Sequence, residues 1–538
     1  TLTNAAGDVR RFAYNESGKV TKITDFDGSA IRRTYNELNR PEEITDQLGR
    51  VTKLSYDAMW NVSRVMLPDG AQTHYYYDEN NRLESVEDAA GNTVSYRYDG
   101  AGNRVSEKDQ LGNATRFSYD ALGRLILVQG EGGLKMSYAY DAEGHVTEAE
   151  DALGNKVFLE YDEAGQLVRE SDAAGACRSY AYTPLGKTES VTDEAGRKVQ
   201  YAYLPGGRLS AVRRSDGTEE SYTYDAAGNV KTHTDRNGFV TSYEYDCLGR
   251  VIRISGSGGE RKEYAYDAAG NVTKVTDAYG HATRYEYSLT GQLTKVTDAL
   301  GNETEYLYDP CDRLTEIRQY GEETEKDKDL LRAEERNRES RICHVTRYQR
   351  NLLGQVETIT DALGQAERYT YDAKGQLIEK LDKEGYLTKY GYTAQGDVNR
   401  IAYADGREVK LSYNPLRLLE EMEDWLGITR IENDAAGRAL KVQYPDGKEV
   451  SYTYGKSGER TGITYPDGRK AEYLYDEEVR LSGPDDRNGM ICYRYDEAGR
   501  LSRKTFPNGM ETSYLYNTSG YLAELAHRDK EGILDRYT

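Results

Sequence analysis

The sequence predicts an all-β protein, built as one long antiparallel ribbon of β-hairpins. Three observations support this fold class: a tyrosine that recurs every 21 residues, period-two alternation in the segments around it, and turn-forming residues between those segments. A fixed period of this size indicates one supersecondary unit copied along the chain. The tyrosines in strict register are Tyr14, Tyr35, Tyr56, Tyr77, Tyr98, Tyr119, Tyr140, Tyr161, Tyr182, Tyr203, Tyr224, Tyr245, Tyr266, Tyr287 and Tyr308.

The register continues to the end of the chain with small slips. The equivalent positions after Tyr308 hold Arg350, Tyr371, Tyr392, Tyr413, Asn433, Tyr454, Tyr475, Tyr495 and Tyr516, so 22 of 24 copies carry tyrosine. Asp follows the tyrosine in many copies, and Gly comes four residues after it. A second Gly falls seven residues before the tyrosine, as at Gly91 and Gly301. Because prominent residues recur in every copy, we interpret them first as parts of a scaffold.

One repeat, Leu289 to Asp309, shows the predicted elements in order. Residues 292–297 are rich in Thr, Val and Leu and predict a strand. Residues 298–302 carry Asp, Gly and Asn, which tolerate the bends of a turn. Residues 303–308 alternate and predict the returning strand, with Thr304, Tyr306 and Tyr308 on one face and Glu303, Glu305 and Leu307 on the other.

The turn at the second glycine has explicit turn chemistry in several copies. Pro68-Asp69-Gly70, Pro445-Asp446-Gly447, Pro466-Asp467-Gly468 and Pro507-Asn508-Gly509 all occupy this position. Proline sets its own φ, Asp or Asn bonds to nearby backbone, and glycine takes the left-handed conformation. We therefore expect positive φ at Gly70, Gly447 and Gly468.

Stacked hairpins must form a continuous sheet, because a single hairpin cannot bury its apolar face. About 48 strands at ~4.8 Å spacing give a ribbon roughly 230 Å long. Wide sheets twist and curl, so we expect the ribbon to spiral into an open or hollow shell; closed into one ring, it would be ~70 Å across.

Composition excludes several classes of protein. Tyr outnumbers Phe by 48 to 6, which suits a thin sheet wetted on both sides, since tyrosine packs its ring and keeps its hydroxyl in water. A net charge of −21 argues against a nucleic-acid-binding surface. No apolar run is long enough for a membrane span. The chain opens without Met and closes in mid-repeat, and we expect it to be a segment of a larger protein.

One interruption divides the ribbon into 1–320, a charged insertion at 321–346, and 347–538. The interval from Tyr308 to Arg350 is 42 residues, one period longer than elsewhere. Its segment Glu322 to Arg341 is strongly charged and predicts a solvated, partly helical excursion from a turn between Tyr320 and Arg347. A tolerated insertion, a partner-docking or plug element, and a degenerate extra repeat all fit this pattern.

The sequence predicts no catalytic, cofactor-binding or metal-binding residues. Ser255-Gly256-Ser257-Gly258-Gly259 lacks the lysine and helix of a phosphate loop and fits a turn, and Asp25-Phe26-Asp27-Gly28 lacks the other ligands of a calcium loop. The cysteines, Cys177, Cys247, Cys311, Cys343 and Cys492, are scattered and predict neither disulfides nor a zinc site. The histidines fall at unrelated repeat phases and form no metal motif: His74, His145, His233, His281, His344 and His527.

The repeats resemble the YD repeats of the Rhs family. The resemblance rests on sequence motifs such as Tyr98-Asp99-Gly100-Ala101-Gly102-Asn103-Arg104, Tyr119-Asp120-Ala121-Leu122-Gly123-Arg124-Leu125, Tyr245-Asp246-Cys247-Leu248-Gly249-Arg250 and Tyr495-Asp496-Glu497-Ala498-Gly499-Arg500-Leu501. It covers the chain outside the insertion. It implies a β ribbon spiralling into a hollow cocoon, as in bacterial polymorphic toxins, toxin-complex shells, wall-associated bacterial proteins and teneurins. Self-cleavage, known in the toxin branch, is not expected here because the chain contains no Asp-Pro-x-Gly-Leu segment.

Two functions follow as hypotheses. The preferred one is a structural, non-enzymatic part of a secreted or surface-delivered bacterial protein, whose shell encloses a C-terminal effector or cargo of the same polypeptide. The alternative is a cell-surface module that binds glycans or surface proteins through exposed rows of tyrosine. Cross-strand aromatic packing explains the tyrosine rows without any ligand.

Overall fold

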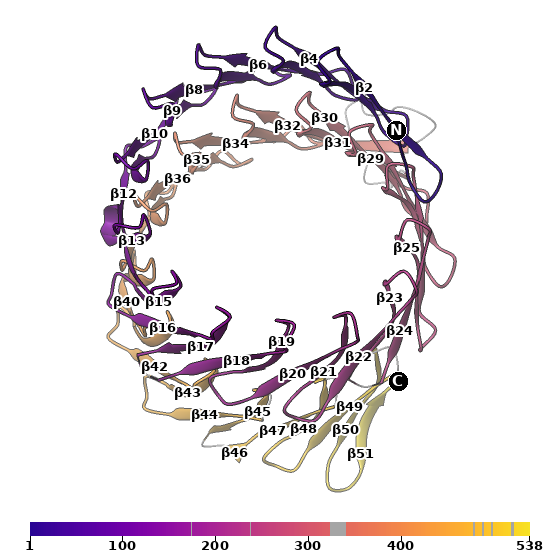
Figure 1. Ribbon diagram of the computed structural model, residues 1–538. Helices are drawn as coiled ribbons and strands as arrows, with labels where there is room; N and C mark the ends of the chain where they lie inside the picture. Colours follow the sequence, from indigo (N-terminus) through magenta and orange to yellow (C-terminus); the bar gives the residue numbers. More distant parts are fainter. Residues whose placement is uncertain are drawn as a thin grey trace. The chain divides into compact units, whose positions relative to one another are not determined.

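The computed structural model describes residues 1–173, 175–236, 238–322, 341–476, 479–486, 489–496, 499–517 and 521–538. Strands β1 to β46 form one sheet, and β47 to β51 form a second (Figure 1). The paired strands are antiparallel, as the alternating patterns predict. Within the described residues the one helical element is a 3-10 turn, Glu131–Gly133. The predicted all-β, antiparallel fold is therefore confirmed.

The strands up to the enlarged hairpin are β1 (Leu2–Thr3), β2 (Val9–Tyr14), β3 (Val20–Thr24), β4 (Ala30–Tyr35), β5 (Pro41–Thr45), β6 (Val51–Tyr56), β7 (Val62–Met66), β8 (Gln72–Tyr77), β9 (Leu83–Glu87), β10 (Thr93–Tyr98), β11 (Arg104–Lys108), β12 (Ala114–Tyr119), β13 (Leu125–Gln129), β14 (Lys135–Tyr140), β15 (Val146–Glu150), β16 (Lys156–Tyr161), β17 (Leu167–Asp172), β18 (Cys177–Tyr182), β19 (Thr188–Thr192), β20 (Lys198–Tyr203), β21 (Leu209–Arg213), β22 (Glu219–Tyr224), β23 (Val230–Thr234), β24 (Val240–Tyr245), β25 (Val251–Gly256), β26 (Arg261–Tyr266), β27 (Val272–Thr276), β28 (Ala282–Tyr287), β29 (Leu293–Thr297), β30 (Glu303–Tyr308) and β31 (Leu314–Glu322).

The strands that follow are β32 (Arg341–Arg350), β33 (Val356–Thr360), β34 (Ala366–Tyr371), β35 (Leu377–Leu381), β36 (Leu387–Tyr392), β37 (Val398–Ala402), β38 (Glu408–Tyr413), β39 (Leu419–Asp424), β40 (Gly427–Asn433), β41 (Ala439–Gln443), β42 (Glu449–Tyr454), β43 (Arg460–Thr464), β44 (Lys470–Tyr475), β45 (Leu481–Asp486), β46 (Gly489–Met490), β47 (Cys492–Tyr495), β48 (Leu501–Thr505), β49 (Glu511–Tyr516), β50 (Leu522–Arg528) and β51 (Ile533–Tyr537).

Each repeat contributes two strands and two five-residue turns. We call the turn that follows the repeat tyrosine the YD turn, and the turn around the second glycine the G2 turn. Both have the same geometry: in the G2 turn 298–302, the Gly301 N–H donates to the Asp298 carbonyl at 3.1 Å. The turn glycine takes positive φ, with values of 91°, 79° and 79° at Gly70, Gly447 and Gly468. The expectation for these three glycines is confirmed.

A β-bulge recurs at the repeat tyrosine. In β10 and β11, Arg97 lies opposite Ser106 and Tyr98 lies opposite Arg104, so Val105 is the extra residue. The same shift occurs at Tyr287 and Tyr371. A bulge increases the local twist of the strand pair, so each repeat adds twist at one defined position.

The two faces of the sheet differ in chemistry. On one face Tyr285 lies opposite Val296, and Val296 lies opposite Thr304. On the other face Lys295 lies opposite Glu305, and its ammonium is 2.9 Å from the carboxylate of Glu303. The predicted division of residues 303–308 between the faces is confirmed.

The sheet has little dry core. No side chain among the described residues combines large size with complete burial, and the buried residues are small or β-branched. This matches the tyrosine-rich composition, in which side chains are half covered by their neighbours along the sheet. The buried residues are Ala71, Ala211, Val212, Val345, Val450, Ala471 and Ala526, with the polar Ser190, Thr429 and Thr512.

The hairpin of β31 and β32 has longer arms than the sequence indicated. The two strands stay paired from Glu316 opposite Arg347 to Glu322 opposite Arg341, so the chain past Tyr320 continues as strand rather than as a turn. Backbone pairing does not depend on the side chain, so charged residues can extend the two strands. The predicted partly helical segment between these arms falls on residues 323–340, which lie outside the described residues.

The chain divides into two units, each made of more than one stretch of sequence. Unit 1 is Thr1–Phe117, Tyr245–Arg253 and Lys262–Glu408, and unit 2 is Ser118–Glu244, Ile254–Arg261 and Val409–Thr538. Within unit 1, hairpins from the first stretch lie beside hairpins from the last stretch, as β6 and β8 do beside β30 to β34 (Figure 1).

Candidate functional site

The repeat tyrosine joins the two strands of a hairpin that are paired through the G2 turn, as β9 and β10 are. The Tyr98 hydroxyl donates a 2.8 Å hydrogen bond to the carbonyl oxygen of Leu83, 15 residues earlier. Because the ring is partly buried while the hydroxyl is bonded to backbone, the side chain serves packing and hydrogen bonding together. Burial raises the pKa of several of these phenols, as at Tyr266 and Tyr203. The same bond is made by Tyr35, Tyr56, Tyr77, Tyr140, Tyr161, Tyr182, Tyr203, Tyr224, Tyr266, Tyr287, Tyr308, Tyr371, Tyr392, Tyr454, Tyr475, Tyr495 and Tyr516.

The aspartate after the tyrosine holds the turn. Asp99 Oδ1 accepts hydrogen bonds from the N–H groups of Ala101 and Asn103 at 2.9 and 2.8 Å, and Oδ2 accepts one from the Asn103 amide at 3.0 Å. These bonds from Asn103 favour the charged carboxylate and lower the pKa of Asp99. The pKa of Asp120 is lowered in the same way, by the backbone and side chain of Arg124.

The residue four positions after the aspartate reaches forward to the next repeat. Arg82 donates through Nε to Asp78 Oδ2 at 2.8 Å and through Nη1 to the Asp99 carbonyl at 2.9 Å. Its guanidinium also lies over the Tyr98 ring, 4.8 Å from the centroid. Arg124 and Arg250 repeat this arrangement on Tyr140 and Tyr266. Sequence reasoning missed this role, although Gly-Arg after Tyr-Asp was visible in the motif.

The two copies without tyrosine keep the same hydrogen bond with other donors. Arg350 donates through Nε and Nη2 to the Leu314 carbonyl at 3.2 and 3.0 Å. Asn433 donates through Nδ2 to the Leu419 carbonyl at 3.0 Å. His145 likewise replaces the forward-reaching arginine: its Nδ1 is 3.0 Å from Asp141 Oδ2, and its ring stacks on Tyr161 at 4.7 Å. The hydrogen bond between the paired strands is therefore preserved where the residue type changes.

A seam of ion pairs joins the two long stretches within unit 1. Arg50 donates through Nη1 and Nη2 to both carboxylate oxygens of Asp312 at 2.8 Å. Hydrogen bonds from Arg50 lower the pKa of Asp312. The Lys374 ammonium lies 2.9 Å from Asp109 Oδ2, and Arg313 pairs with Asp69 at 2.5 Å. In each pair a G2 turn of residues 1–117 meets a YD turn of residues 262–408.

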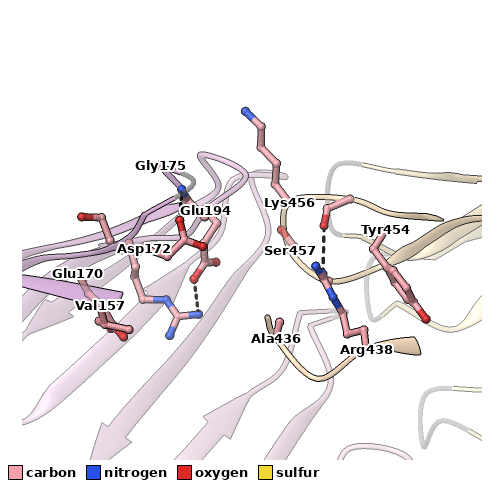
Figure 2. Close-up of a pocket in the computed structure, with 15 residues that line it drawn as sticks. Val157, Glu170, Asp172, Gly175, Glu194, Ala436, Arg438, Tyr454, Lys456 and Ser457 are labelled. Atoms are coloured by element: carbon pink, nitrogen blue, oxygen red, sulfur yellow. Dashed lines mark hydrogen bonds and ion pairs between the residues drawn. The ribbon is translucent and has the colours of Figure 1, made fainter. Parts of the chain in front are cut away.

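Unit 2 contains the same type of seam and a cavity along it. Arg197 of a G2 turn bonds to the Ser457 hydroxyl of a YD turn at 3.4 Å. Beside this contact is an open cavity of about 670 Å³ (Figure 2). Two of the charged groups in its lining are engaged in ion pairs: Glu194 pairs with Arg178 at 3.0 Å, and Arg438 pairs with Asp434 at 2.6 Å. Its lining combines turn residues such as Gly175 and Gly458 with strand residues such as Val157 and Tyr454.

The sequence motifs that were weighed as possible sites are turns. Gly256 N–H donates to the Glu260 carbonyl and Gly259 N–H to the Gly256 carbonyl, so residues 256–260 form a G2 turn, and the glycine-rich motif is a turn as predicted. Residues 25–28 do the same, and Asp25 is held by Arg10 at 2.8 Å. Cys177, Cys247, Cys311 and Cys492 have free thiols, and the Cys343 side chain lies outside the described groups.

The histidines lie apart from one another. His281 is 3.0 Å from Asp277, His233 stacks on Tyr222 and is 3.7 Å from Glu220, and His527 bonds to the Thr512 hydroxyl at 3.0 Å. His74 and His344 lie in β8 and β32. Over the described parts of the chain, no group of three or more His, Cys, Asp or Glu side chains is arranged to hold a metal ion. The described residues also contain no helix of the length and apolarity that a membrane crossing requires.

Comparison with solved structures supports the fold. A crystal structure described as TcdB2-TccC3 matches 98% of this chain with a TM-score of 0.66 at 13% identity, and the matched region is 34% of that chain. A second, described as TcdB2-TccC3-TEV, matches 96% with a TM-score of 0.53 at 12% identity. This chain therefore spans about a third of the length of these proteins. No curated protein matches the sequence.

Family comparison identifies the repeats. The Teneurin YD-shell model matches residues 2–76, 70–205 and 187–326, which together exceed half of the chain. The RHS Repeat model matches residues 350–386, 371–408, 434–470 and 495–532. Both are families of structural repeats. The chain belongs to the Teneurin YD-shell family and carries RHS repeats in its C-terminal part.

Proposed function

We propose that this chain is a structural segment of a larger Rhs/YD-repeat protein and forms part of a β shell that encloses a C-terminal effector or cargo. The observation that carries the proposal is the use of the repeat side chains. Tyr98, Asp99 and Arg82 all bond within or between hairpins. Among the described residues, these repeated side chains hold strands and turns together, which is the role expected of a structural wall.

The fold similarity supports the same proposal. The chain covers about a third of a TcdB2-TccC3 chain, which leaves room in a protein of that kind for an enclosed segment. The enclosed effector, the secreted or surface location and the bacterial origin extend the Rhs resemblance to this chain. Within the proposed shell, residues 1–320 and 347–538 are wall, and 321–346 are a charged insertion in one hairpin.

The alternative, glycan or protein binding through tyrosine rows, needs available phenol groups. The repeat hydroxyls are bonded to backbone carbonyls instead, as at Tyr56 and Tyr371. A sugar that accepted a hydrogen bond from one of these hydroxyls would have to displace the backbone carbonyl. The encapsulating role is therefore the better supported of the two.

The test is protease protection of the C-terminal region in the full-length parent protein. Single substitutions such as Tyr98→Phe should leave protection of the C-terminal region nearly intact, because many equivalent hydrogen bonds stabilise the shell. Substituting a run of consecutive repeat tyrosines should open the wall and expose the C-terminal region to protease. A single substitution that abolished a defined ligand affinity, with the fold intact, would favour the binding module instead.

A further inference from the structure

One YD turn of unit 1, residues 309–313, makes ion pairs with two successive G2 turns. Asp312 accepts two hydrogen bonds of 2.8 Å from Arg50. The next residue, Arg313, pairs with Asp69 of the following G2 turn at 2.5 Å. Two adjacent residues of opposite charge therefore each face a residue of the complementary charge across the seam. We call Asp312 and Arg313 the register pair.

Asp312 lies in a left-handed conformation at a place where neighbouring YD turns carry glycine. Its φ is 59°, and Gly291 and Gly354, which hold the same place, each have φ of 83°. A side chain in this region costs free energy, although aspartate tolerates it better than most residues do. The Asp312 carboxylate also accepts a hydrogen bond from the Thr290 hydroxyl at 3.2 Å. An unfavourable backbone conformation that directs a carboxylate to Arg50 points to a specific role.

A shift of the seam by one 21-residue repeat would remove both ion pairs of the register pair. The G2-turn residues that would then face Asp312 and Arg313 carry no charge. They are Ser29 and Leu48 for a shift toward the N-terminus, and Ala71 and Ala90 for a shift the other way. Leaving two partly buried charges without partners is unfavourable, so the register pair disfavours both shifted registers.

The third ion pair of the seam does not make this distinction. The Lys374 ammonium lies 2.9 Å from Asp109, the first residue of its G2 turn. The first residue of the preceding G2 turn is Asp88. A shift toward the N-terminus would therefore give Lys374 an equivalent carboxylate. Backbone pairing does not fix the alignment either, because the paired strands are neighbours along the chain.

We propose that the register pair determines how the two long stretches of unit 1 align. Asp312 and Arg313 select the G2 turns of Arg50 and Asp69 by charge. They thereby decide which hairpins of residues 262–408 lie beside which hairpins of residues 1–117. The two charges have opposite sign, so the selection rejects a shift in either direction.

Carbodiimide crosslinking of the 538-residue chain, followed by peptide mapping, tests the alignment directly. This reagent joins an amine to a carboxylate that it contacts. A product between Lys374 and Asp109 reports the observed register, and a product between Lys374 and Asp88 reports the shifted one. The wild type should give the Asp109 product. Lys295 and Glu303 lie 2.9 Å apart within one hairpin, so their product reports that the hairpins are folded.

The variant Asp312→Gly/Arg313→Gln removes both charges of the register pair. It should fold, because Gly375 and Gln376 hold the same places in another YD turn of unit 1. The ratio of the Asp109 product to the Asp88 product should fall by roughly tenfold, which is what two partly exposed ion pairs contribute together.

A second variant, Asp312→Arg, sets one guanidinium against that of Arg50. Arginine suits the backbone at this place, because Arg417 has φ of 65° in another YD turn. Repulsion adds to the loss of the ion pair, so the ratio of the Asp109 product to the Asp88 product should fall in this variant as well.

Asn81→Gly/Arg82→Gln is the matched control. Asn81 has a left-handed φ of 67° and is followed by arginine, as Asp312 is, but its turn contributes to none of the three seam ion pairs. Its product ratio should equal that of the wild type. An unchanged ratio in both register-pair variants, or an equal fall in the control, would overturn the proposal. Loss of the Asp109 product without an Asp88 product would also overturn it, because the pair would then hold the seam closed without selecting its register.

Discussion

The hydroxyl of Tyr98 donates a 2.8 Å hydrogen bond to the carbonyl of Leu83, and the ring of Tyr98 lies beneath the guanidinium of Arg82. The Tyr98 side chain thus joins β10 to β9 and also contacts the YD turn that precedes β9. Repetition of this bond along the chain makes stability a sum of local terms between neighbouring hairpins.

Replacing Tyr98 by Phe should destabilise its hairpin by about 1 kcal/mol, because the Leu83 carbonyl loses its partner while the ring still packs. Amide hydrogen exchange should report faster opening of β9 to β11 and little change elsewhere. Tyr279→Phe is the matched control, since Tyr279 is exposed at a turn and should show no change. Equal effects from the two variants would contradict the role of the hydroxyl.

Trp60→Gly should stabilise the chain by about 1 kcal/mol, because it relieves a left-handed tryptophan. Urea unfolding monitored by circular dichroism measures this change. Loss of stability would mean that the indole makes contacts worth more than the backbone strain.

Gly70→Val should act in the opposite direction and destabilise its turn by roughly 1 kcal/mol or more. Gly70 has φ of 91°, and a Cβ there would meet no atom within 4 Å, so the effect is backbone strain rather than a clash. The same urea titration compares it with Gly100→Ala, where φ is not in the left-handed region. A neutral Gly70→Val would contradict the strain argument.

Arg50 and Asp312 should be energetically coupled across the unit 1 seam. The pair is bidentate and only partly exposed, so a double-mutant cycle with alanine should give a coupling of about 1 kcal/mol that weakens in salt. Arg407 and Asp405, an exposed pair within one turn, should give a smaller value. Zero coupling for Arg50 and Asp312 would show that the seam does not hold the two stretches together.

Acid should destabilise the YD turns. The pKa values of Asp99 and Asp120 are lowered, with hydrogen bonds from Asn103 and Arg124 as the main causes. A lowered folded-state pKa gives stability that is present above the unfolded pKa of about 3.9 and is lost as pH falls through the folded value. Stability measured by urea titration should therefore hold near neutral pH and decline below about pH 4. A free energy of unfolding that rises on acidification would contradict this prediction.

Much of the fold could be predicted because it repeats. Period-two alternation placed residues 303–308 on the correct faces, and Pro-Asp-Gly placed Gly70, Gly447 and Gly468 in the left-handed region. Both signals are local, since strand faces and turn conformations depend on residues close in sequence. The absence of a recognisable catalytic motif also came from the sequence, as an expectation about function.

Only the tertiary structure decided which side chains join the two strands of a hairpin and which join the two long stretches of unit 1. The bond from Tyr98 to Leu83 spans 15 residues, and the pair Arg50–Asp312 spans 262 residues. Neither follows from a local pattern, because it depends on the strand stagger, on the bulge at each tyrosine, and on which turns meet. For the same reason, only the structure showed that Arg350 and Asn433 preserve the tyrosine's hydrogen bond. In these two copies a side-chain N–H donates to the same backbone carbonyl position as the tyrosine hydroxyl does, and the residue type alone does not reveal this.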